Sequence, residues 1–578
     1  MIERWQTWSD RRKAMMLLIL LAIIYGTLAF GFLPRHVFFA GDEGEKVLVV
    51  ASSVRSGDWW RVKFEYPGLA FDPEVEAFFS PWVRVVDGQP VPYHLSTMNF
   101  WNPPLYALFG VSGLYVLPLL AGVGLAWLAY HLARLMALPH PWVVIPLVGL
   151  TTPVFFYSLT TWDHMPTVFY STLTVLLLAR QARRRNSCEM ATAGVLMGLG
   201  IWTRLEMYLF APAALMAYFY VFRRQRGVWR SLIPTVLGFT AVMVGMVAQH
   251  VAVYGKFDLI AWNVRTASVA EDSPGASSLL EVARGLVFRQ AQVLLALTVD
   301  GSELWLERVF LALAFAGTVL VFRLPRLQRH PLLTMGCALM QVIGTALAFV
   351  HSRLYTVVGL VPTLPLMALS LAHVSPQADK ELPPSRLALE LAATAAMLFL
   401  LLGLFLLPTF GGLTWGPRYL SELFPLLPVL AWATFWRVRE AVDHADARRA
   451  VQIAFGLLAI TSLVVQCVGV GILFDQKAKM VAWYTDLNEL DVEFVLSDQQ
   501  FYLQYMASLY FERIFLCPRT QAIYDRLAER LYEHGVGRFA WVPSEVSEVD
   551  PLIETPRFAV RQIRGYLHEI VPVAEGGG

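Results

Sequence analysis

Long apolar runs separated by short charged segments dominate this chain. The first run, from Ala14 to Leu33, follows Arg11, Arg12 and Lys13 and holds about twenty residues without a charge. A helix of that length can cross a bilayer, whereas the core of a signal peptide is shorter. Further runs that predict membrane spans lie near residues 113–133, 141–160, 164–182, 189–203, 207–222, 231–253, 304–322, 331–350, 354–374, 387–408, 423–436 and 450–474. The pattern therefore predicts about thirteen transmembrane helices.

The basic residues fall on alternate loops between these runs, as expected for a membrane protein whose cytoplasmic loops are enriched in Lys and Arg. The residues on one side are Arg134, Arg180, Arg183, Arg184, Arg185, Arg223, Arg224, Arg226, Arg230, Arg323, Arg326, Arg329, Arg437, Arg439, Arg448 and Arg449. We expect this side to face the cytoplasm. With an odd number of spans, the N-terminus lies inside, and everything after residue 474 lies outside the plasma (inner) membrane.

Beyond residue 474 the apolar runs become short and alternate with amphipathic stretches, which is typical of a soluble α/β fold. We expect strands within VEFVLS, RIFLC and VGRFAWV, and helices over 498–511 and 519–534. The expected organisation is an all-α polytopic membrane domain (1–474) followed by a small extracytoplasmic α/β domain (475–578). The membrane domain includes a first outer loop (34–104) of about seventy residues, and long ordered loops are usually functional.

The composition supports this class of protein. The chain has 578 residues, of which 56% are hydrophobic and 16% charged, far from the balance of a soluble enzyme. The net charge of +2 hides basic residues bunched in short loops, so we do not expect nucleic acid as a partner. The four cysteines, Cys188, Cys337, Cys467 and Cys517, lie far apart without metal-type spacing. We expect neither a zinc site nor a disulfide framework.

Two adjacent carboxylates, Asp42 and Glu43, follow the first span within FFAGDEGEKVLVV. One interpretation is a helix-capping box, in which Asp42 pairs with Glu45 three residues later. The other is catalytic, because a positioned carboxylate can accept a proton from a substrate. Capping leaves Glu43 unexplained, and a capping Asp can still turn its second oxygen toward a substrate. We therefore predict that Asp42 and Glu43 are catalytic.

The segment TTWDHMP places Asp163 and His164 at the outer mouth of the fourth span. We predict that both contact substrate. An ordinary interfacial turn explains them equally well, with Trp162 in the aromatic belt and Pro166 in the first helical turn.

The segment IWTRLEMY holds Arg204 and Glu206 between apolar runs of 15 and 16 residues, shorter than the roughly 20 needed to cross a bilayer. The short runs draw both charges toward the membrane plane, where ionisable residues are costly and usually face a cavity or a partner. We predict that both residues bind substrate. The alternative is a structural ion pair, which we disfavour because residues two apart need not face each other.

The segment FGGLTWGPRYL places Trp415, Arg418 and Tyr419 before the twelfth span. Arg is suited to a bidentate grip on phosphate oxygens, so we predict a substrate-binding role. An anchor at the membrane interface explains these residues about equally well when they are taken alone. Four such clusters on one outer face favour a common polar site over four separate features.

Taken in order, these motifs resemble the C-type glycosyltransferases. The similarity rests on a first span followed by a long outer loop that begins GDE, the short outer turns WDHMP and TRLE, and WGPRYL before a late span. The branch that the chain resembles holds the protein O-mannosyltransferases and the lipid A aminoarabinose transferases. The resemblance covers the membrane part, roughly four-fifths of the chain, and the order of the motifs is its most specific element.

The resemblance implies transfer of a sugar from a polyprenyl-phosphate-linked donor to a lipid, glycan or protein acceptor on the outer face. By residue match, Asp42 takes the acidic role of the first-loop motif, with Glu43 as its companion. Some relatives carry a basic residue later in that loop, and Arg61, Lys63 and His94 are the candidates here.

Elementary chemistry supports the same reaction. A polyprenyl phosphate leaves readily once an Arg holds its charge, so Arg204 or Arg418 is expected to clamp the phosphate. One carboxylate base then suffices, which gives direct displacement with inversion. We expect no cofactor, although a divalent cation could share the clamp. The alternatives are a non-catalytic scaffold and a transporter or flippase of lipid-linked sugars, which would be expected to show paired half-repeats and charges near the midplane.

Overall fold

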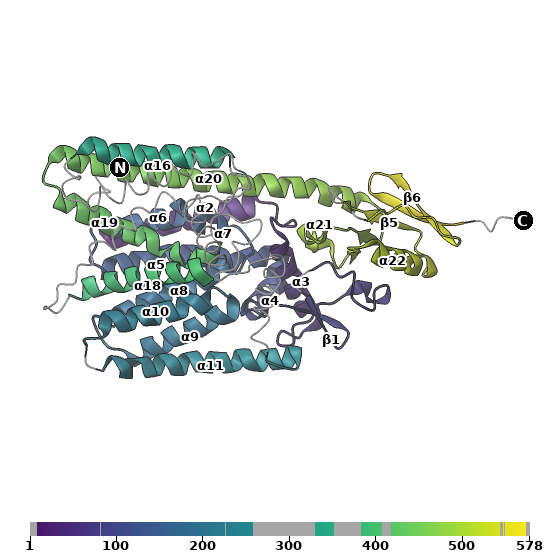
Figure 1. Ribbon diagram of the computed structural model, residues 1–578, viewed down its shortest axis with the longest axis horizontal. Coiled ribbons are helices and arrows are strands. Elements are labelled where there is room, and N and C mark those ends of the chain that lie inside the picture. Colours follow the sequence, from purple (N-terminus) through teal and green to yellow (C-terminus); the bar gives the residue numbers. More distant parts are fainter. Residues whose placement is uncertain are drawn as a thin grey trace, which may run out of the picture.

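The structure is a computed structural model that describes residues 8–80, 83–225, 227–257, 330–351, 383–406, 418–543, 547 and 549–573. Most of its helices lie side by side along the long axis of the molecule (Figure 1). These helices are α2 (Asp10–Gly26), continued by a π-helical segment (Thr27–Phe32), α5 (Val116–Leu135), α6 (Val144–Thr151), α7 (Val154–Tyr157), α8 (His164–Arg180), α9 (Ser187–Thr203), α10 (Met207–Phe222), α11 (Val228–Tyr254), α16 (Pro331–His351), α18 (Pro384–Leu406), α19 (Leu426–Ala441) and α20 (Ala445–Glu489).

The predicted spans correspond to these helices wherever the structure describes them. In that part of the chain, five helical segments are both long and apolar enough to cross a membrane by composition: Asp10–Phe32, Met98–Leu135, Val228–Tyr254, Pro384–Gly403 and Ala445–Glu489. The spans expected at 304–322 and 354–374 lie outside the described residues. The helical membrane fold is therefore present, and the count of thirteen stays a prediction.

The span expected over 141–160 is broken into α6 and α7. Helix α6 ends at Thr151, and Thr152 is extended (φ −128°, ψ 166°) directly before Pro153. A residue before proline is pushed out of the helical region by contact with the proline ring. The break leads into the turn around residue 161 that forms one wall of the cavity described below.

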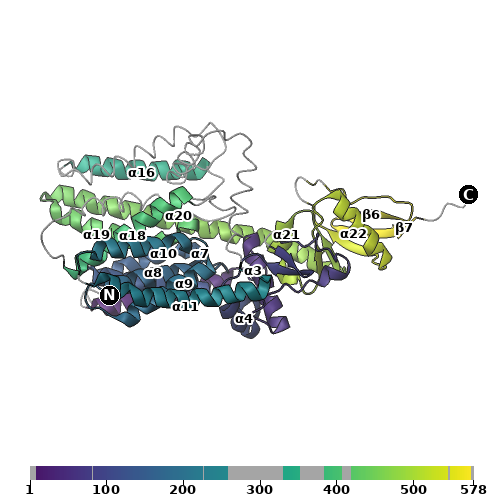
Figure 2. The same cartoon turned by 60° about the horizontal axis from the view of Figure 1, so that its bottom comes forward.

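Helix α20 is 45 residues long and extends from the bundle to the C-terminal sheet (Figures 1 and 2). The tail that we expected from residue 475 therefore begins inside this helix. Buried Lys477 on α20 donates hydrogen bonds to the Pro34 carbonyl oxygen (2.9 Å) and the Tyr115 hydroxyl (2.6 Å). These bonds fix the start of the first outer loop against the helix.

The C-terminal sheet has five strands in the order β4-β3-β5-β7-β6. Their bounds are β3 (Phe494–Leu496), β4 (Ile514–Leu516), β5 (Arg538–Trp541), β6 (Phe558–Arg564) and β7 (Leu567–Pro572), with helices α21 (Gln500–Tyr505) and α22 (Gln521–Glu533). Strands β4, β3 and β5 are parallel and match the three predicted segments, whereas the antiparallel hairpin β6–β7 was not predicted.

The first outer loop and the tail share one hydrophobic core. The loop contains α3 (Gly41–Ser56), β1 (Val83–Val86), β2 (Gln89–Pro92) and the start of α4 (Met98–Phe109). Phe79 of the loop lies against Tyr510 and Phe515 of the tail, with ring centroids 5.3 and 5.8 Å apart. The Cys517 amide donates to the Ala77 carbonyl oxygen (2.7 Å). Because buried apolar surface is the main stabilising term, loop and tail stabilise each other.

The start of α2 and the C-terminal sheet lie at opposite ends of the molecule in both views. This arrangement is the one expected if the N-terminus and the tail lie on opposite sides of a membrane. Which side faces the cytoplasm stays a prediction from the basic loops.

Candidate functional site

A cavity of about 180 Å³ lies where α3 meets the turn before α8, the start of α4, the end of α9 and a 3₁₀ segment (Arg418–Leu423). Its charged lining residues are Asp42, Glu45, Lys46, Asp163, Arg204, Glu206 and Arg418. Its neutral polar lining residues include His94, Ser96, Asn99, Asn102, Thr161, Thr203 and Tyr419. All four predicted clusters thus contribute at least one charged residue to the cavity.

Asp42 does not cap its helix. The residue before α3 is Ala40, which makes no side-chain capping bond, and Asp42 is the second residue of α3. Its carboxylate accepts a hydrogen bond from the Arg418 guanidinium (2.8 Å) and remains 33% exposed. Burial would raise the pKa of Asp42, but the charges of Arg418 and Lys46 outweigh it and lower the pKa. The carboxylate is therefore ionised and accessible from the cavity.

Glu43 has a structural role instead. Its carboxylate is fully buried and accepts hydrogen bonds from the Phe39 amide (2.7 Å) and the Thr161 amide (2.8 Å). Phe39 precedes the N-cap residue Ala40, so Glu43 ties the chain before α3 to the helix and does not form a capping box. Glu43 is absent from the cavity lining, so it joins α3 to the turn before α8 and does not meet a ligand there.

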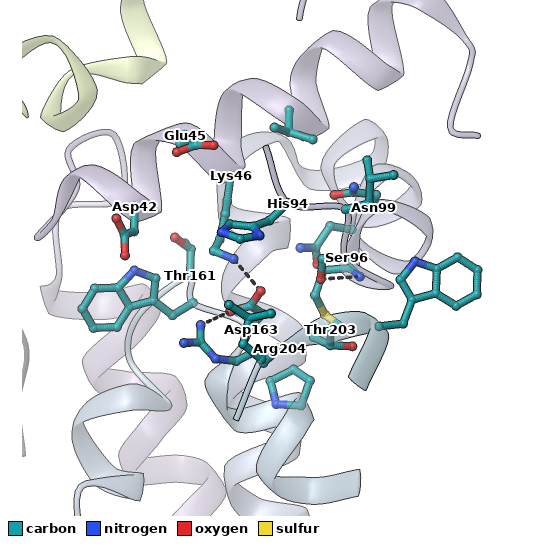
Figure 3. Close-up of a pocket in the computed structure, with 18 of the residues that line it drawn as sticks. Asp42, Glu45, Lys46, His94, Ser96, Asn99, Thr161, Asp163, Thr203 and Arg204 are labelled. Atoms are coloured by element: carbon teal, nitrogen blue, oxygen red, sulfur yellow. Dashed lines mark hydrogen bonds and ion pairs between the residues drawn. The ribbon is translucent and has the colours of Figure 1, made fainter. Parts of the chain in front are cut away.

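Asp163 is the centre of a buried ion cluster (Figure 3). The Lys46 ammonium lies 2.5 Å from one carboxylate oxygen and the Arg204 guanidinium 2.8 Å from the other. Burial opposes ionisation, but these two cations lower the pKa of Asp163 to about 2. The neighbouring His164 is buried and stacks on Tyr157 (centroids 4.9 Å apart) rather than lining the cavity.

Arg204 and Glu206 form the ion pair that we disfavoured, so that expectation was wrong. Arg204 donates to both carboxylate oxygens of Glu206, at 2.6 to 3.1 Å. Arg204 lies just beyond the end of α9 with extended backbone (φ −149°, ψ 147°), which turns its side chain back toward Glu206. The same guanidinium also reaches Asp163, so the pair is part of the cavity wall and not a separate surface feature.

Arg418 joins the acidic helix to the last predicted cluster. Besides Asp42, it donates to the Tyr419 hydroxyl (3.1 Å), and its guanidinium lies over the Trp162 ring at 6.0 Å. Its buried Nε–H has no hydrogen-bond partner among the described residues. Trp415 lies outside the described residues, so its predicted contact with substrate stays a prediction.

Lys46 carries no motif that predicts a role from sequence, and the spacing of Glu45 predicts only a capping partner for Asp42. Both lie on the face of α3 that carries Asp42, at the third and fourth positions after it, which a helical projection could have shown. Burial and the charge of Asp42 raise the pKa of Glu45 well above the ordinary glutamate value. Neighbouring carboxylates whose pKa values are pushed apart in this way are typical of acid–base sites. Of the loop's basic candidates, His94 lines the cavity, whereas Arg61 and Lys63 do not.

The opposite face of α3 is held by the tail. A Cβ atom at Gly44 would lie 1.9 Å from the Gln504 carbonyl oxygen, and one at Gly41 would lie 1.9 Å from Gln504 Oε1. The Phe38 amide donates to the Tyr505 carbonyl oxygen (3.0 Å). Helix α21 therefore contacts the backbone of α3 itself at Gly44, where a side chain would meet the backbone of α21 and separate the two helices.

Within the described part of the chain, no group of three or more His, Cys, Asp or Glu residues has the arrangement of a metal site.

The chain matches no protein-family model and no curated protein in sequence. Its fold is similar to that of ArnT from Cupriavidus metallidurans bound to undecaprenyl phosphate, with a TM-score of 0.53, 12% identity, and coverage of 98% of this chain and 99% of that chain. The apo structure of the same ArnT gives a TM-score of 0.50, 14% identity, and coverage of 93% and 94%. The archaeal oligosaccharyltransferase AglB from Archaeoglobus fulgidus, in complex with an inhibitory peptide and a dolichol-phosphate, is more distant, with a TM-score of 0.46, 12% identity, and coverage of 93% and 70%.

At such identities the likeness concerns the fold alone. ArnT is a lipid A aminoarabinose transferase with the C-type membrane glycosyltransferase fold. That fold extends over almost the whole of this chain, which confirms the fold expected from the resemblance.

Proposed function

We propose that this protein is a membrane glycosyltransferase that moves a sugar from a polyprenyl-phosphate donor to a lipid, glycan or protein acceptor on the extracytoplasmic face. The observation that carries the proposal is the contact between the Asp42 carboxylate and the Arg418 guanidinium inside a cavity that Lys46 and Arg204 also line. A base beside three cations suits a reaction that deprotonates one substrate and releases an anion from the other.

The donor phosphate is assigned to Arg418 and Lys46. The Arg418 Nε–H is buried without a partner in the described structure, and Lys46 is 29% exposed. Arg204 is already bonded to Asp163 and Glu206, so it holds the cluster in place and can exchange a carboxylate for phosphate only at a cost. Its predicted role as a phosphate clamp is therefore secondary to that of Arg418.

In the proposed reaction, an acceptor hydroxyl attacks the anomeric carbon while the bond from that carbon to the phosphate oxygen breaks. The bonding electrons leave with the polyprenyl phosphate, and the hydroxyl proton passes to Asp42. A single displacement inverts the anomeric configuration. When phosphate engages Arg418, the contact between Arg418 and Asp42 weakens, and the basicity of Asp42 rises at the moment it must accept a proton.

The other predicted residues receive supporting roles. Glu43 positions α3, while Asp163 and Glu206 orient Lys46 and Arg204. Tyr419 orients Arg418. No resident cofactor is proposed, although a divalent cation could share the phosphate with the three cations.

The test uses the full-length protein in proteoliposomes, with undecaprenyl-phosphate sugars labelled in the sugar. Addition of envelope lipids, glycans and proteins should move the label into one acceptor class and release undecaprenyl phosphate. Label that only crosses the bilayer while it stays on its lipid would favour the flippase. Failure to bind undecaprenyl phosphate would contradict both functions.

A further inference from the structure

The cavity wall away from Asp42 is neutral. In Figure 3, Ser96, Asn99 and Thr203 lie across the cavity from Asp42, with Lys46, His94, Asp163 and Arg204 between the two sides. Asn99 and Asn102 are one turn apart on α4. The cations that suit phosphate and the amides that suit neutral groups are therefore segregated within one cavity.

Asn99 and Asn102 have hydrogen-bonding atoms without partners. The Asn99 Nδ2 donor and the Asn102 Oδ1 acceptor are buried and make no hydrogen bond with any described residue. Both side chains are only 6% exposed, and both line the cavity. An unsatisfied buried polar group is destabilising, so such a pair is expected to be completed by a ligand. One free donor and one free acceptor match the hydroxyls of a sugar, each of which both donates and accepts.

An aromatic side chain adds an apolar surface beside these amides. The Trp202 ring lines the cavity and packs edge-on against Phe100, with centroids 5.6 Å apart. Its indole N–H donates to Gln249 Oε1 (3.0 Å), which fixes the orientation of the ring. A rigid ring beside a few placed polar groups is typical of small-molecule sites.

On these grounds, and resting on the proposed function, we propose that Asn99 and Asn102 bind the donor sugar, and that this sugar is an uncharged polyol. A buried ammonium on the sugar would need a carboxylate, and a buried carboxylate would need a cation. Asp42, Asp163 and Glu206 are paired with Arg418, Lys46 and Arg204. The remaining carboxylate of the cavity, Glu45, lies on the same face of α3 as Asp42, and burial disfavours its charged form. Amino sugars and uronic acids are thus disfavoured at this subsite.

The experiment measures binding to purified full-length protein in nanodiscs with four probes. These are undecaprenyl phosphate and its glucose, 4-amino-arabinose and galacturonic acid derivatives. Asn99→Leu and Asn102→Leu replace each amide with an apolar side chain of similar size. Each should weaken binding of the glucosyl donor about tenfold, the effect of one lost hydrogen bond, and leave undecaprenyl phosphate binding unchanged.

The matched control is Thr172→Val, since Thr172 on α8 also has a buried hydroxyl without a partner in the described residues but does not line the cavity. It should bind all probes as the wild type does. If a Leu variant does not fold, Asn99→Ser and Asn102→Ser give the same comparison with a shorter polar side chain.

Two outcomes overturn the inference. Equal weakening of undecaprenyl phosphate and the glucosyl donor would place the amides outside a sugar subsite. Tighter binding of the amino or acidic donor by the wild type would contradict an uncharged sugar. Wild-type protein that binds none of the probes, undecaprenyl phosphate included, would instead contradict the proposed function itself.

Discussion

Helix α3 presents two faces of different character. One face carries Asp42, Glu45 and Lys46 into the cavity, and the other carries Gly41 and Gly44 against α21 of the tail. Residues three and four apart share a face of a helix, so five residues suffice to build both surfaces. The first face contains the proposed chemistry, and the second sets where that chemistry is placed.

The two faces are also held by different forces. Ion pairs on the cavity face lose solvation when they are buried, and a ligand of the right charge can replace one partner. The glycine face is held by close backbone contact, which loses its fit if one methyl group is added. We infer that the cavity face is adjustable during a reaction cycle, whereas the glycine face is rigid.

The largest effect is expected from removing the proposed base. Asp42→Asn keeps the size of the side chain and removes no cap, because Asp42 does not cap α3. Turnover should fall by a factor of about 10² to 10⁴, the usual contribution of a positioned base, while donor binding and folding persist. Labelled-donor transfer and a binding assay on the same preparation check this. A fully active variant would move the search for the base to Glu45 and Asp163.

The second largest effect is expected from Arg418, the ion-pair partner of Asp42. Arg418→Lys keeps the positive charge but loses the planar fork, so the Kd of the donor should rise about 10- to 100-fold. Arg204→Lys is the matched comparison, and its effect on donor binding should be smaller because Arg204 mainly holds Asp163 and Glu206. Unchanged donor affinity in both variants would remove the guanidinium groups from phosphate binding.

The glycine face is tested by Gly44→Val. The new side chain would overlap the Gln504 carbonyl oxygen, so we expect a loss of about 1–3 kcal/mol in unfolding free energy and reduced transfer. Gly456→Ala on α20 is the control, because a Cβ atom there meets nothing within 4 Å. Thermal unfolding in detergent measures both. If Gly44→Val were as stable and as active as the control, the tail would not position α3.

Glu43→Gln should show whether Glu43 only positions α3 or also takes part in catalysis. The Gln side chain keeps one oxygen that can accept a hydrogen bond, but it no longer offers the charged carboxylate to which the Phe39 and Thr161 backbone N–H groups donate. We expect the unfolding free energy to fall by about 1 kcal/mol. Turnover should fall much less than in Asp42→Asn. Asp87→Asn, in the exposed turn between β1 and β2, is the control for charge removal, since Asn also suits the positive φ (51°) of that position. A loss of turnover that matches Asp42→Asn would return Glu43 to the catalytic pair.

The smallest expected effect concerns how the activity depends on pH. Because the pKa of Asp42 is lowered in the free protein, its basic form persists in acid, and kcat/KM, which reports the free protein, should stay flat from about pH 8 down to about pH 5. Burial and the charge of Asp42 raise the pKa of Glu45, so a Glu45 base would instead lose activity at a higher pH than an Asp42 base as the solution is acidified. Glu45→Gln should leave the acid side of the profile unchanged. A wild-type kcat/KM that already falls above about pH 5, together with a loss of turnover in Glu45→Gln, would identify Glu45 as the base.

Local sequence patterns were enough to predict the membrane helices and three strands of the C-terminal sheet. Apolar runs predicted the described membrane helices, since each run must satisfy its backbone hydrogen bonds internally wherever it lies in the fold. Three strands of the tail followed from short apolar segments. The β6–β7 hairpin also had a local signal in Gly565, whose positive φ (50°) suits the turn between two strands.

The sequence also placed Asp42, Asp163, Arg204 and Arg418 at outer ends of helices, which limited the site to one face of the membrane. It could not say which of them meet. Lys46 and Asp163 are 117 residues apart, and Asp42 and Arg418 are 376 apart. No local pattern encodes such contacts, because they depend on how the helices pack.

The different roles of Asp42 and Glu43 were likewise decided by tertiary structure. The two residues are adjacent and chemically alike, but consecutive positions on a helix point about 100° apart. Contact between Gly44 and Gln504 fixes the rotation of α3, which turns Asp42 into the cavity and Glu43 toward the turn before α8. The sequence determined that acids would stand here, and packing against the tail decided which one lines the cavity.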